Sequence, residues 1–326
     1  MKTLLVGYRA ADLTPELLEG DVTCHTLDIY HRHAIEKVHH AKAVCSAHLP
    51  EGPWDLVRFK TGPKIHSGEL ALDLLQEIAT LLKNGEAAPP PLEKNPKFLL
   101  DFEGRERDRN DLLGKIKDDP KRVRSFRAEW PASVPGGEKL MFTSYPGCFC
   151  HRRLDEGGLA LAEVVSRDFL NTEAQRHGEL RILDMGCGCG LVGLLIANRL
   201  AQEATLNSRL STLNLTLVDS HSRAVEAATE NAAKFGIPAE VILSDSGTPA
   251  RMDGTFDVFV GNPPYYSDYR IAEVFLETAK RALKPGGICY TVVKNAAGLK
   301  PVQERYFRSV AVVGRRNYSV LKSVKE

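Results

Sequence analysis

No apolar run in this sequence approaches the ~20 residues that a membrane-spanning helix requires. The N-terminal segment Met1–Arg9 carries only a short apolar run before charged residues appear, so we expect neither a membrane helix nor a signal peptide. An excess of charge is also missing, because 43 Lys and Arg residues stand against 42 Asp and Glu residues. Overall charge therefore gives no argument for a nucleic-acid partner, and any such argument depends on local patches.

The cysteines do not form a recognisable disulfide or metal-binding pattern. Their number, seven, is odd, and without a signal peptide they predict a cytoplasmic protein with reduced thiols. The segment Cys148-Phe149-Cys150-His151 contains two cysteines and a histidine, but no second Cys/His pair at zinc-type spacing accompanies it. We therefore assign the cysteines to packing and predict no metal.

The length and the alternation of patterns predict two α/β domains. A single core stops growing near ~250 residues, and this chain has 326. Strand and helix signals alternate twice along it, which is typical of α/β sheets with mostly parallel strands. A proline-rich stretch at residues 86–96 and a densely charged stretch at 104–127 separate the halves. We predict one domain over residues 1–130 and a second over residues 131–326.

The second half has the clearest secondary-structure signals. Short apolar runs predict strands, and amphipathic stretches ended by Gly or Pro predict helices. The predicted strands are 181–184, 213–218, 241–243, 256–260 and 288–293, the predicted helices are 191–200, 222–235 and 271–283, and residues 306–313 and 318–324 are expected as neighbouring strands or a ribbon. This predicts a seven-stranded, mostly parallel, Rossmann-like sheet.

The first half resembles the second, which indicates an internal repeat. Trp54–Val57 is similar to Phe256–Phe259, and each is followed by a proline-containing loop and a helix, at 69–82 and 271–283. We interpret the first half as a degenerate copy of the second fold, because it has no glycine-rich turn. The alternative is that any two αβ units look alike.

A glycine-rich turn predicts a nucleotide-type cofactor site. Asp184-Met-Gly-Cys-Gly-Cys-Gly190 lies between a predicted strand and a predicted helix, where open α/β sheets bind ligands. Asp219 ends the next strand, where a carboxylate can accept both ribose hydroxyls of an adenosine cofactor. Asp245 follows the third strand and can accept from an adenine amino group, although a capped turn is the alternative reading. The predicted cofactor-binding residues are Asp184, Gly186, Cys187, Gly188, Gly190, Asp219, Ser220, Asp245, Ser246 and Asn262. The glycine turn and Asp219 alone do not separate a nicotinamide dinucleotide from S-adenosylmethionine.

The segment Asn262-Pro-Pro-Tyr265 after the fourth strand is the most specific motif in the chain. Paired prolines fix φ and withhold two backbone donors. The Asn262 side-chain oxygen and the Pro263 carbonyl can then both accept from one planar amino group, whose delocalised lone pair makes it a poor nucleophile. Tyr265 offers a ring on which a flat base can stack. We predict Asn262, Pro263, Pro264 and Tyr265 as the catalytic residues of an S-adenosylmethionine-dependent N-methyltransferase.

With these motifs, the sequence resembles the class I methyltransferases, and more closely the tandem-domain bacterial ribosomal RNA guanine-N2 methyltransferases. The segment Gly147–Gly158 and the ending Tyr318–Ser323 are similar to that family as well. The resemblance implies a catalytic C-terminal domain and an N-terminal copy that has lost the cofactor and helps to hold RNA. It further implies ribosomal RNA or a ribosomal subunit as the partner, and Asp155 is a site candidate on this resemblance alone. One departure is Tyr265-Tyr-Ser-Asp-Tyr269, where the family usually has Phe and His.

Other readings remain open on the sequence. The same motif serves methyl transfer to adenine N6 or to a protein glutamine. A nicotinamide-dependent oxidoreductase shares the glycine turn, and a non-catalytic RNA-binding assembly factor can keep a relict site. The basic segment Lys121–Arg127 and the cluster His151–Arg153 can contact phosphates, but a charged run is as often a solvated face.

Overall fold

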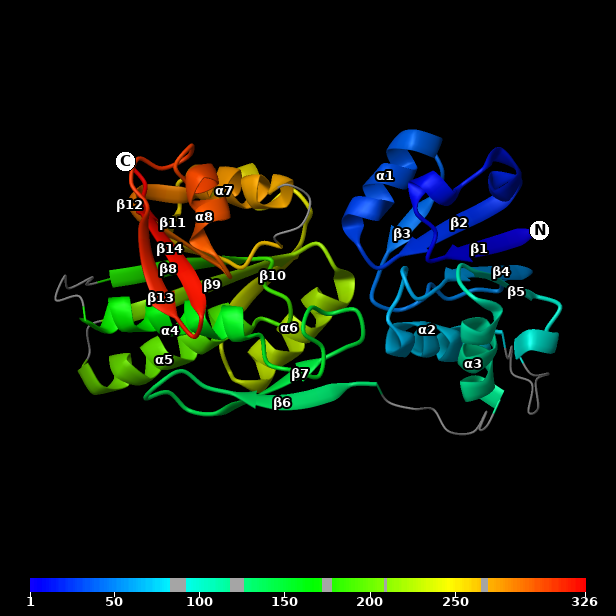
Figure 1. The fold of residues 1–326 in the computed structure, drawn as a ribbon, viewed down its shortest axis with the longest axis horizontal. Coiled ribbons are helices and arrows are strands. Elements are labelled where there is room, and N and C mark those ends of the chain that lie inside the picture. The colour runs from blue at the N-terminus through cyan, green and yellow to red at the C-terminus, as the bar shows by residue number, and fades with distance from the viewer. Residues whose placement is uncertain (83–91, 118–125, 172–177, 208–209, 265–268) are drawn as a thin grey trace. The chain divides into compact units, whose positions relative to one another are not determined.

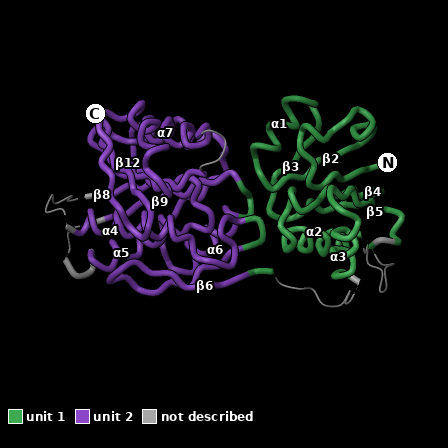
Figure 2. The backbone as a smooth tube through the Cα atoms, viewed as in Figure 1, with its two compact units in different colours: residues 1–127, 145–147, 221–223 green, residues 128–144, 148–220, 224–326 purple. Residues whose placement is uncertain are grey.

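A computed structural model describes residues 1–82, 92–117, 126–171, 178–207, 210–264 and 269–326. The described chain divides into two compact units (Figure 2). Unit 1 comprises residues 1–127, 145–147 and 221–223, and unit 2 comprises residues 128–144, 148–220 and 224–326. No helix among these described ranges is long and apolar enough to span a membrane.

Unit 1 is a five-stranded parallel sheet with helices on both faces (Figure 1). The strand order is β3-β2-β1-β4-β5. Its elements are β1 (Lys2–Val6), β2 (Asp21–Thr26), α1 (Ile29–His39), β3 (Ala43–Cys45), β4 (Leu56–Thr61), α2 (Gly68–Leu81), β5 (Phe98–Phe102) and α3 (Glu106–Lys117), with short 3-10 turns at Ala10–Asp12, Pro15–Leu18 and Leu92–Lys94.

The two faces of this sheet bury different side chains, as the period of a strand requires. Leu4 of β1 belongs to an apolar cluster with α2 and α3, whereas the next residue, Leu5, belongs to a cluster with Ile35 of α1. Helices α1 and α2 begin at residues whose side chains cap them: Asp28 accepts from the amide of Tyr30 at 2.9 Å, and Ser67 accepts from an amide of α2 at 3.2 Å.

Unit 2 contains the seven-stranded sheet that the sequence predicts, in the order β10-β9-β8-β11-β12-β14-β13. Five strands are parallel, and β14 is antiparallel to both β12 and β13. The elements are α4 (Glu156–Asn171), β8 (Gly178–Met185), α5 (Leu191–Asn207), β9 (Leu210–Asp219), α6 (Ser222–Lys234), β10 (Ala239–Leu243), β11 (Phe256–Gly261), α7 (Arg270–Ala282), β12 (Leu283–Val293), α8 (Ala296–Gln303), β13 (Ala311–Arg315) and β14 (Tyr318–Val324), preceded by a hairpin of β6 (Ala128–Ala132) and β7 (Leu140–Ser144), with a 3-10 turn at Ala250–Met252.

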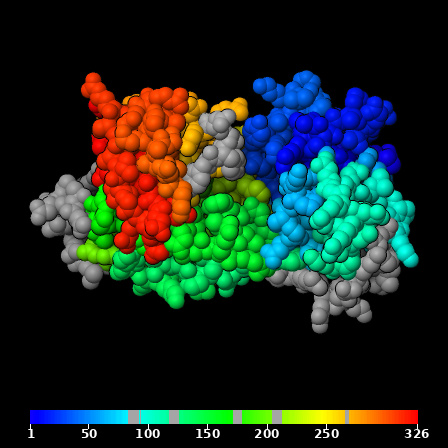
Figure 3. Space-filling model, viewed as in Figure 1, coloured from blue at the N-terminus to red at the C-terminus, as the bar shows by residue number. Residues whose placement is uncertain are grey.

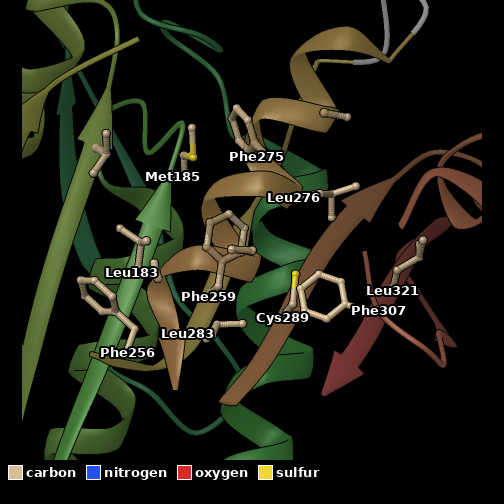
Figure 4. Close-up of a cluster of buried hydrophobic side chains, with 14 of the residues drawn as sticks. Leu183, Met185, Phe256, Phe259, Phe275, Leu276, Leu283, Cys289, Phe307 and Leu321 are labelled. Carbon is tan, nitrogen blue, oxygen red and sulfur yellow. The ribbon is translucent and has the colours of Figure 1, made fainter. Parts of the chain in front are cut away.

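A dense apolar core fixes α7 against the centre of this sheet (Figure 4). Phe256 and Phe259 of β11 and Leu276 of α7 are fully buried in it, and Phe275 is nearly so. Burial of each such side chain stabilises the fold by about 1.5–3 kcal/mol before entropy is counted. The core thereby holds the ends of β8 and β11 in one place, which matters for the site below.

The structure of this unit differs from the sequence prediction in three places. Residues 306–313 were expected as a strand, but β13 begins only at Ala311 and follows the unpredicted helix α8. Helix α8 contains Gly298 and Pro301, which weaken a helical pattern, and its start depends on Asn295, whose side chain accepts from an amide of α8 at 3.0 Å. The predicted strand began at residue 288, yet residues 284–287 also lie within β12.

Pairing with the chain end explains the extended conformation of residues 284–287. The amide of Gly286 donates to the carbonyl of Lys325 at 2.7 Å, and the amide of Lys325 donates to the carbonyl of Gly287 at 2.8 Å. These partners lie about forty residues downstream, so a local pattern does not reveal them. Strands β13 and β14 lie at the surface of unit 2 (Figure 3), in keeping with exposed Val312 and Val324.

The two units share one strand order, which confirms the predicted tandem architecture. In unit 1 the first five strands are ordered 3-2-1-4-5, and the first five strands of the large sheet in unit 2 follow the same order. Strands β4 and β11 hold the same place in the two sheets. They contain Leu56 and Val57 of the first copy and Phe256–Phe259 of the second. The repeat in sequence therefore corresponds to a repeat in topology.

Candidate active site

The predicted cofactor turn connects β8 to α5 and is shaped by glycine. Gly186, Gly188 and Gly190 all have positive φ, at 69°, 55° and 85°, a region that costs other residues energy. The amides of Gly186 and Cys187 both donate to the carbonyl of Val218, at 2.8 and 3.0 Å. These bonds tie the turn to the end of β9.

The space beside two of these glycines differs. A Cβ on Gly186 would lie 2.6 Å from the ring of Phe275, so a side chain there has no room. A Cβ on Gly188 would meet no described atom within 4 Å. Gly188 therefore presents bare backbone to open space at the strand ends, as a site for a bound nucleotide requires.

Asp184 lies beneath the turn. Its carboxylate is 1% exposed and accepts from the amide of Gly193, in the first turn of α5, at 2.8 Å. Burial raises the pKa of Asp184 to about 7, and the nearby carboxylates of Asp219 and Asp155 add to that shift, against the hydrogen bond from Gly193. The structure therefore gives Asp184 a role in holding the turn against α5.

The remaining predicted cofactor residues lie at the ends of β9 and β10. Asp219 is half-buried, and its carboxylate accepts from the amide of Gly188 at 2.9 Å. The carbonyl of Asp219 accepts from the amide of Ser244 at 2.9 Å, which brings the loop after β10 beside it. Asp245 is half-buried and Ser246 is exposed. The strand order thus gathers Asp219, Ser220, Asp245 and Ser246 at one edge of the sheet.

The predicted catalytic motif follows β11, which pairs directly with β8. Gly261 at the end of β11 is in register with Met185 at the end of β8. Asn262 and the glycine turn therefore leave adjacent strands at the same level. Asn262 is half-buried, Pro263 is buried and Pro264 is half-buried. The fourth predicted catalytic residue, Tyr265, lies outside the described residues, as does most of the basic segment 121–127.

Asp155 is brought to this motif from a distant part of the sequence. Its carboxylate accepts from the side-chain amide of Asn262, with 2.8 Å between Oδ2 and Nδ2. Burial raises the pKa of Asp155, and Glu156 adds to it, whereas hydrogen bonds from Gly158, Asn262 and Gly157 act in the opposite direction. The sequence suggested Asp155 only through the family resemblance and gave it no partner.

Sequence reasoning missed Asn231 entirely. This residue of α6 is fully buried, and its side chain exchanges hydrogen bonds with the backbone amide and carbonyl of Thr143, at 2.8 and 2.9 Å. It also donates to the carbonyl of Cys189 in the glycine turn at 2.9 Å. An Asn within an amphipathic helical pattern gives little local signal for such a role, since its partners are 42 and 88 residues away.

The cysteines of the site lie where packing requires apolar groups. Cys148, Cys187, Cys189 and Cys289 are buried, and burial is the largest cause that raises the thiol pKa of Cys187, Cys189 and Cys289. Within the ranges that the structure describes, no three His, Cys, Asp or Glu side chains converge as a metal site would require.

A mostly parallel sheet with a glycine turn after its first strand and an Asn-Pro-Pro motif after its fourth defines a Rossmann-like methyltransferase. Residues 139–322 match the family model of the methyltransferase small domain, and the chain belongs to this family. The predictions of fold and methyltransferase class are therefore confirmed.

Curated relatives and a solved structure are similar to this chain. Ribosomal RNA small subunit methyltransferase C of Hahella chejuensis is 34% identical over 51% of this chain and 44% of its own length. Ribosomal RNA large subunit methyltransferase G of Streptomyces griseus is 30% identical over 61% of this chain and 49% of its own length. The chain thus matches about half the length of these relatives.

The solved structure extends the likeness in fold to the whole chain. The T. thermophilus 16S rRNA N2 methyltransferase, in complex with AdoMet and guanosine, superposes with a TM-score of 0.73. The match covers 100% of this chain and 88% of that one at 17% sequence identity. At this identity the likeness establishes the fold.

Proposed function

We propose that this protein transfers a methyl group from S-adenosylmethionine to an exocyclic amino nitrogen of a base in ribosomal RNA, guanine N2. One observation carries the proposal: Asn262 and the glycine turn leave adjacent, in-register strands, Gly261 being paired with Met185. A methyl donor on the turn and an amine on Asn262 would therefore be neighbours. The names of the ribosomal RNA methyltransferases that this chain resembles support the substrate class.

The residues of the turn fit an adenosine cofactor. Gly188 leaves space for close approach, and the half-buried carboxylate of Asp219 stands beside it at the end of β9. Asp245 follows β10 at the same edge of the sheet, where its carboxylate would accept from an adenine amino group. Bound S-adenosylmethionine would supply an electrophilic methyl on a sulfonium.

The chain's own part in the reaction is to hold and polarise the amine. The Asn262 oxygen and the Pro263 carbonyl would accept the two hydrogens of the amino group, which shifts electron density toward nitrogen and aims its lone pair. Displacement at a sulfonium needs alignment more than a strong base, so positioning and electrostatics supply most of the rate. The proton can leave after transfer.

We further propose that unit 1 supports RNA binding and holds no cofactor. It keeps the strand order of unit 2, but only Gly7 follows β1 where unit 2 has the glycine turn. A Cβ on Gly7 would lie 2.4 Å from the carbonyl of Lys60 and 2.8 Å from the ring of His66, so protein atoms fill this place.

Labelled S-adenosylmethionine tests the substrate class directly. The protein is incubated with ribosomal RNA, with ribosomal subunits, or with a release factor as the glutamine-containing alternative. We expect label in RNA. Label in the protein substrate alone would support the glutamine reading, and no label in any substrate would support a relict, non-catalytic site.

Replacement of Asn262 tests the role of the motif. We expect Asn262→Ala to lower kcat by about 10²–10³-fold, as loss of one transition-state hydrogen bond does elsewhere, and to leave S-adenosylhomocysteine binding nearly unchanged in calorimetry. Asn214→Ala is the matched control, because Asn214 is exposed on β9 and bonds Glu179. Unchanged turnover in Asn262→Ala would remove this residue from the mechanism.

A further inference from the structure

The contact with Asp155 bears on the orientation of the Asn262 side chain. A side-chain amide has one branch that donates and one that accepts, and the site works only if the accepting branch faces the target amine. The donating Nδ2 of Asn262 lies 2.8 Å from Oδ2 of Asp155. An ionised carboxylate can only accept, so it selects the amide orientation in which Nδ2 faces it. The oxygen of Asn262 is then turned away from Asp155.

Asp155 is itself held by the start of α4. Its Oδ1 accepts from the amide of Gly157 at 3.0 Å, and its backbone carbonyl accepts from the amide of Leu159 at 2.9 Å. This is the pattern of a residue that caps a helix N-terminus. The backbone thus fixes Oδ1 of Asp155, and because the carboxylate is rigid this also fixes the position of Oδ2.

Glycines make room for the carboxylate. A Cβ on Gly158 would lie 2.6 Å from Oδ2 of Asp155, and a Cβ on Gly157 would lie 3.4 Å from Oδ1 and 3.1 Å from the ring of Tyr318. A side chain at Gly158 would therefore collide with the carboxylate, whereas one at Gly157 would press on the ring of Tyr318. The Asp-Glu-Gly-Gly sequence therefore leaves space for the carboxylate that contacts Asn262.

We propose that Asp155 is a positioning residue that orients the Asn262 amide, so that its oxygen accepts from the substrate amino group. This inference rests on the proposed function, since it names the device that prepares Asn262 for an amine. A role in capping α4 alone would stabilise the helix without any effect on the chemistry.

Asp155→Asn separates the two roles, because Asn caps a helix about as well as Asp. The cap needs an acceptor toward Gly157, so the new side chain must turn its amino group toward Asn262. Two amino groups cannot face each other, and Asn262 must invert and present its own amino group to the substrate. We expect kcat to fall about 100-fold, with Kd for S-adenosylhomocysteine within about twofold and Tm within about 2 °C of wild type.

The matched control is Asp28→Asn, which makes the same exchange at the cap of α1, where Asp28 accepts from Tyr30. This variant should keep full activity. Turnover of Asp155→Asn within twofold of wild type would overturn the proposal.

Loss of folding in Asp155→Asn would be seen as a lower Tm, and Gly158→Ala then serves as the second variant. Its Cβ displaces the carboxylate without altering any charge, and Gly68→Ala in the first turn of α2, with open space around it, is its control.

An exchange of the two side chains provides a rescue. In Asp155→Asn/Asn262→Asp, the amino group at position 155 donates to a carboxylate at 262, whose second oxygen is turned away from residue 155 and can accept from the substrate. We expect at least ~10-fold higher kcat than for Asp155→Asn alone. A double variant no better than the single one would contradict a role through orientation.

A readout without substrate keeps this proposal distinct from the proposed function. If wild-type protein labels no RNA, the function fails, whatever Asp155 does. The orientation itself is then read from neutron diffraction on deuterated crystals, which distinguishes the amide branches. We expect Nδ2 of Asn262 to face residue 155 in the wild type and Oδ1 to face it in Asp155→Asn. The same orientation in both would overturn the proposal.

Discussion

Gly186 and Gly188 belong to one turn, yet substitution should affect them in different ways. Both have positive φ, so an Ala at either costs about 1 kcal/mol or more in backbone strain. At Gly186 the new Cβ also collides with Phe275, a residue of the core, whereas at Gly188 it enters open space. One glycine serves packing and the other leaves room for a ligand.

We therefore expect Gly188→Ala to weaken S-adenosylhomocysteine binding at least ~10-fold while Tm falls by only a few degrees. Gly186→Ala should lower Tm more, because its strain and its collision with Phe275 add. Isothermal calorimetry and thermal unfolding check the pair. Full affinity in Gly188→Ala would mean that the cofactor does not lie against this part of the turn.

Because of Asp184, we expect the stability of the fold to decrease as pH rises. Its pKa is about 7 in the folded protein and about 3.8 when unfolded. Between these pH values Asp184 keeps a proton in the folded state that it has released in the unfolded state. The contribution of Asp184 to the free energy of unfolding therefore falls as pH rises from 4 to 7. Asp184→Asn keeps an acceptor for Gly193 and has no charge to bury.

The stabilising effect of Asp184→Asn should thus be larger at pH 8 than at pH 5, by at most about 3 kcal/mol. Thermal or urea unfolding of wild type and variant at both pH values measures the difference. Equal effects at the two pH values would show that Asp184 has an ordinary pKa in the folded protein.

At the scale of elements, α6 holds the glycine turn through Asn231. Three hydrogen bonds connect this one side chain to β7 and to Cys189. We expect Asn231→Leu to cost about 2–3 kcal/mol, because it leaves buried backbone groups unpaired. Tm should fall by about 4–12 °C, and Asn214→Leu on the exposed side of β9 is the control. An unchanged Tm would mean that the turn and β7 hold their places without α6.

Elements with a local signature were predictable, and those that depend on distant partners were not. The strand-turn-helix around Gly186 carries its own pattern of apolar residues and glycines, so it was found from the sequence. Helix α8 contains Pro301, and the stretch before Ile288 contains two glycines, so the local pattern indicated breaks where the fold has elements. The site followed the same rule, because Asn262 has a motif, whereas its contact with Asp155 crosses 107 residues.

At the scale of the whole molecule, one strand order occurs twice, but a glycine turn occurs once. We expect S-adenosylhomocysteine to bind with a stoichiometry of one per chain, since protein atoms surround Gly7 in unit 1. Calorimetric titration measures this number. Two equivalents per chain would mean that unit 1 keeps a cofactor site.

The identity of the methylated nucleoside tests the central claim most directly. Ribosomal RNA from cells that lack this protein, complemented with wild type or with Asn262→Ala, is digested and its nucleosides are quantified by mass spectrometry. The account predicts that N2-methylguanosine is restored by the wild type alone. Restoration of N6-methyladenosine instead, or equal nucleosides in all three samples, would contradict it.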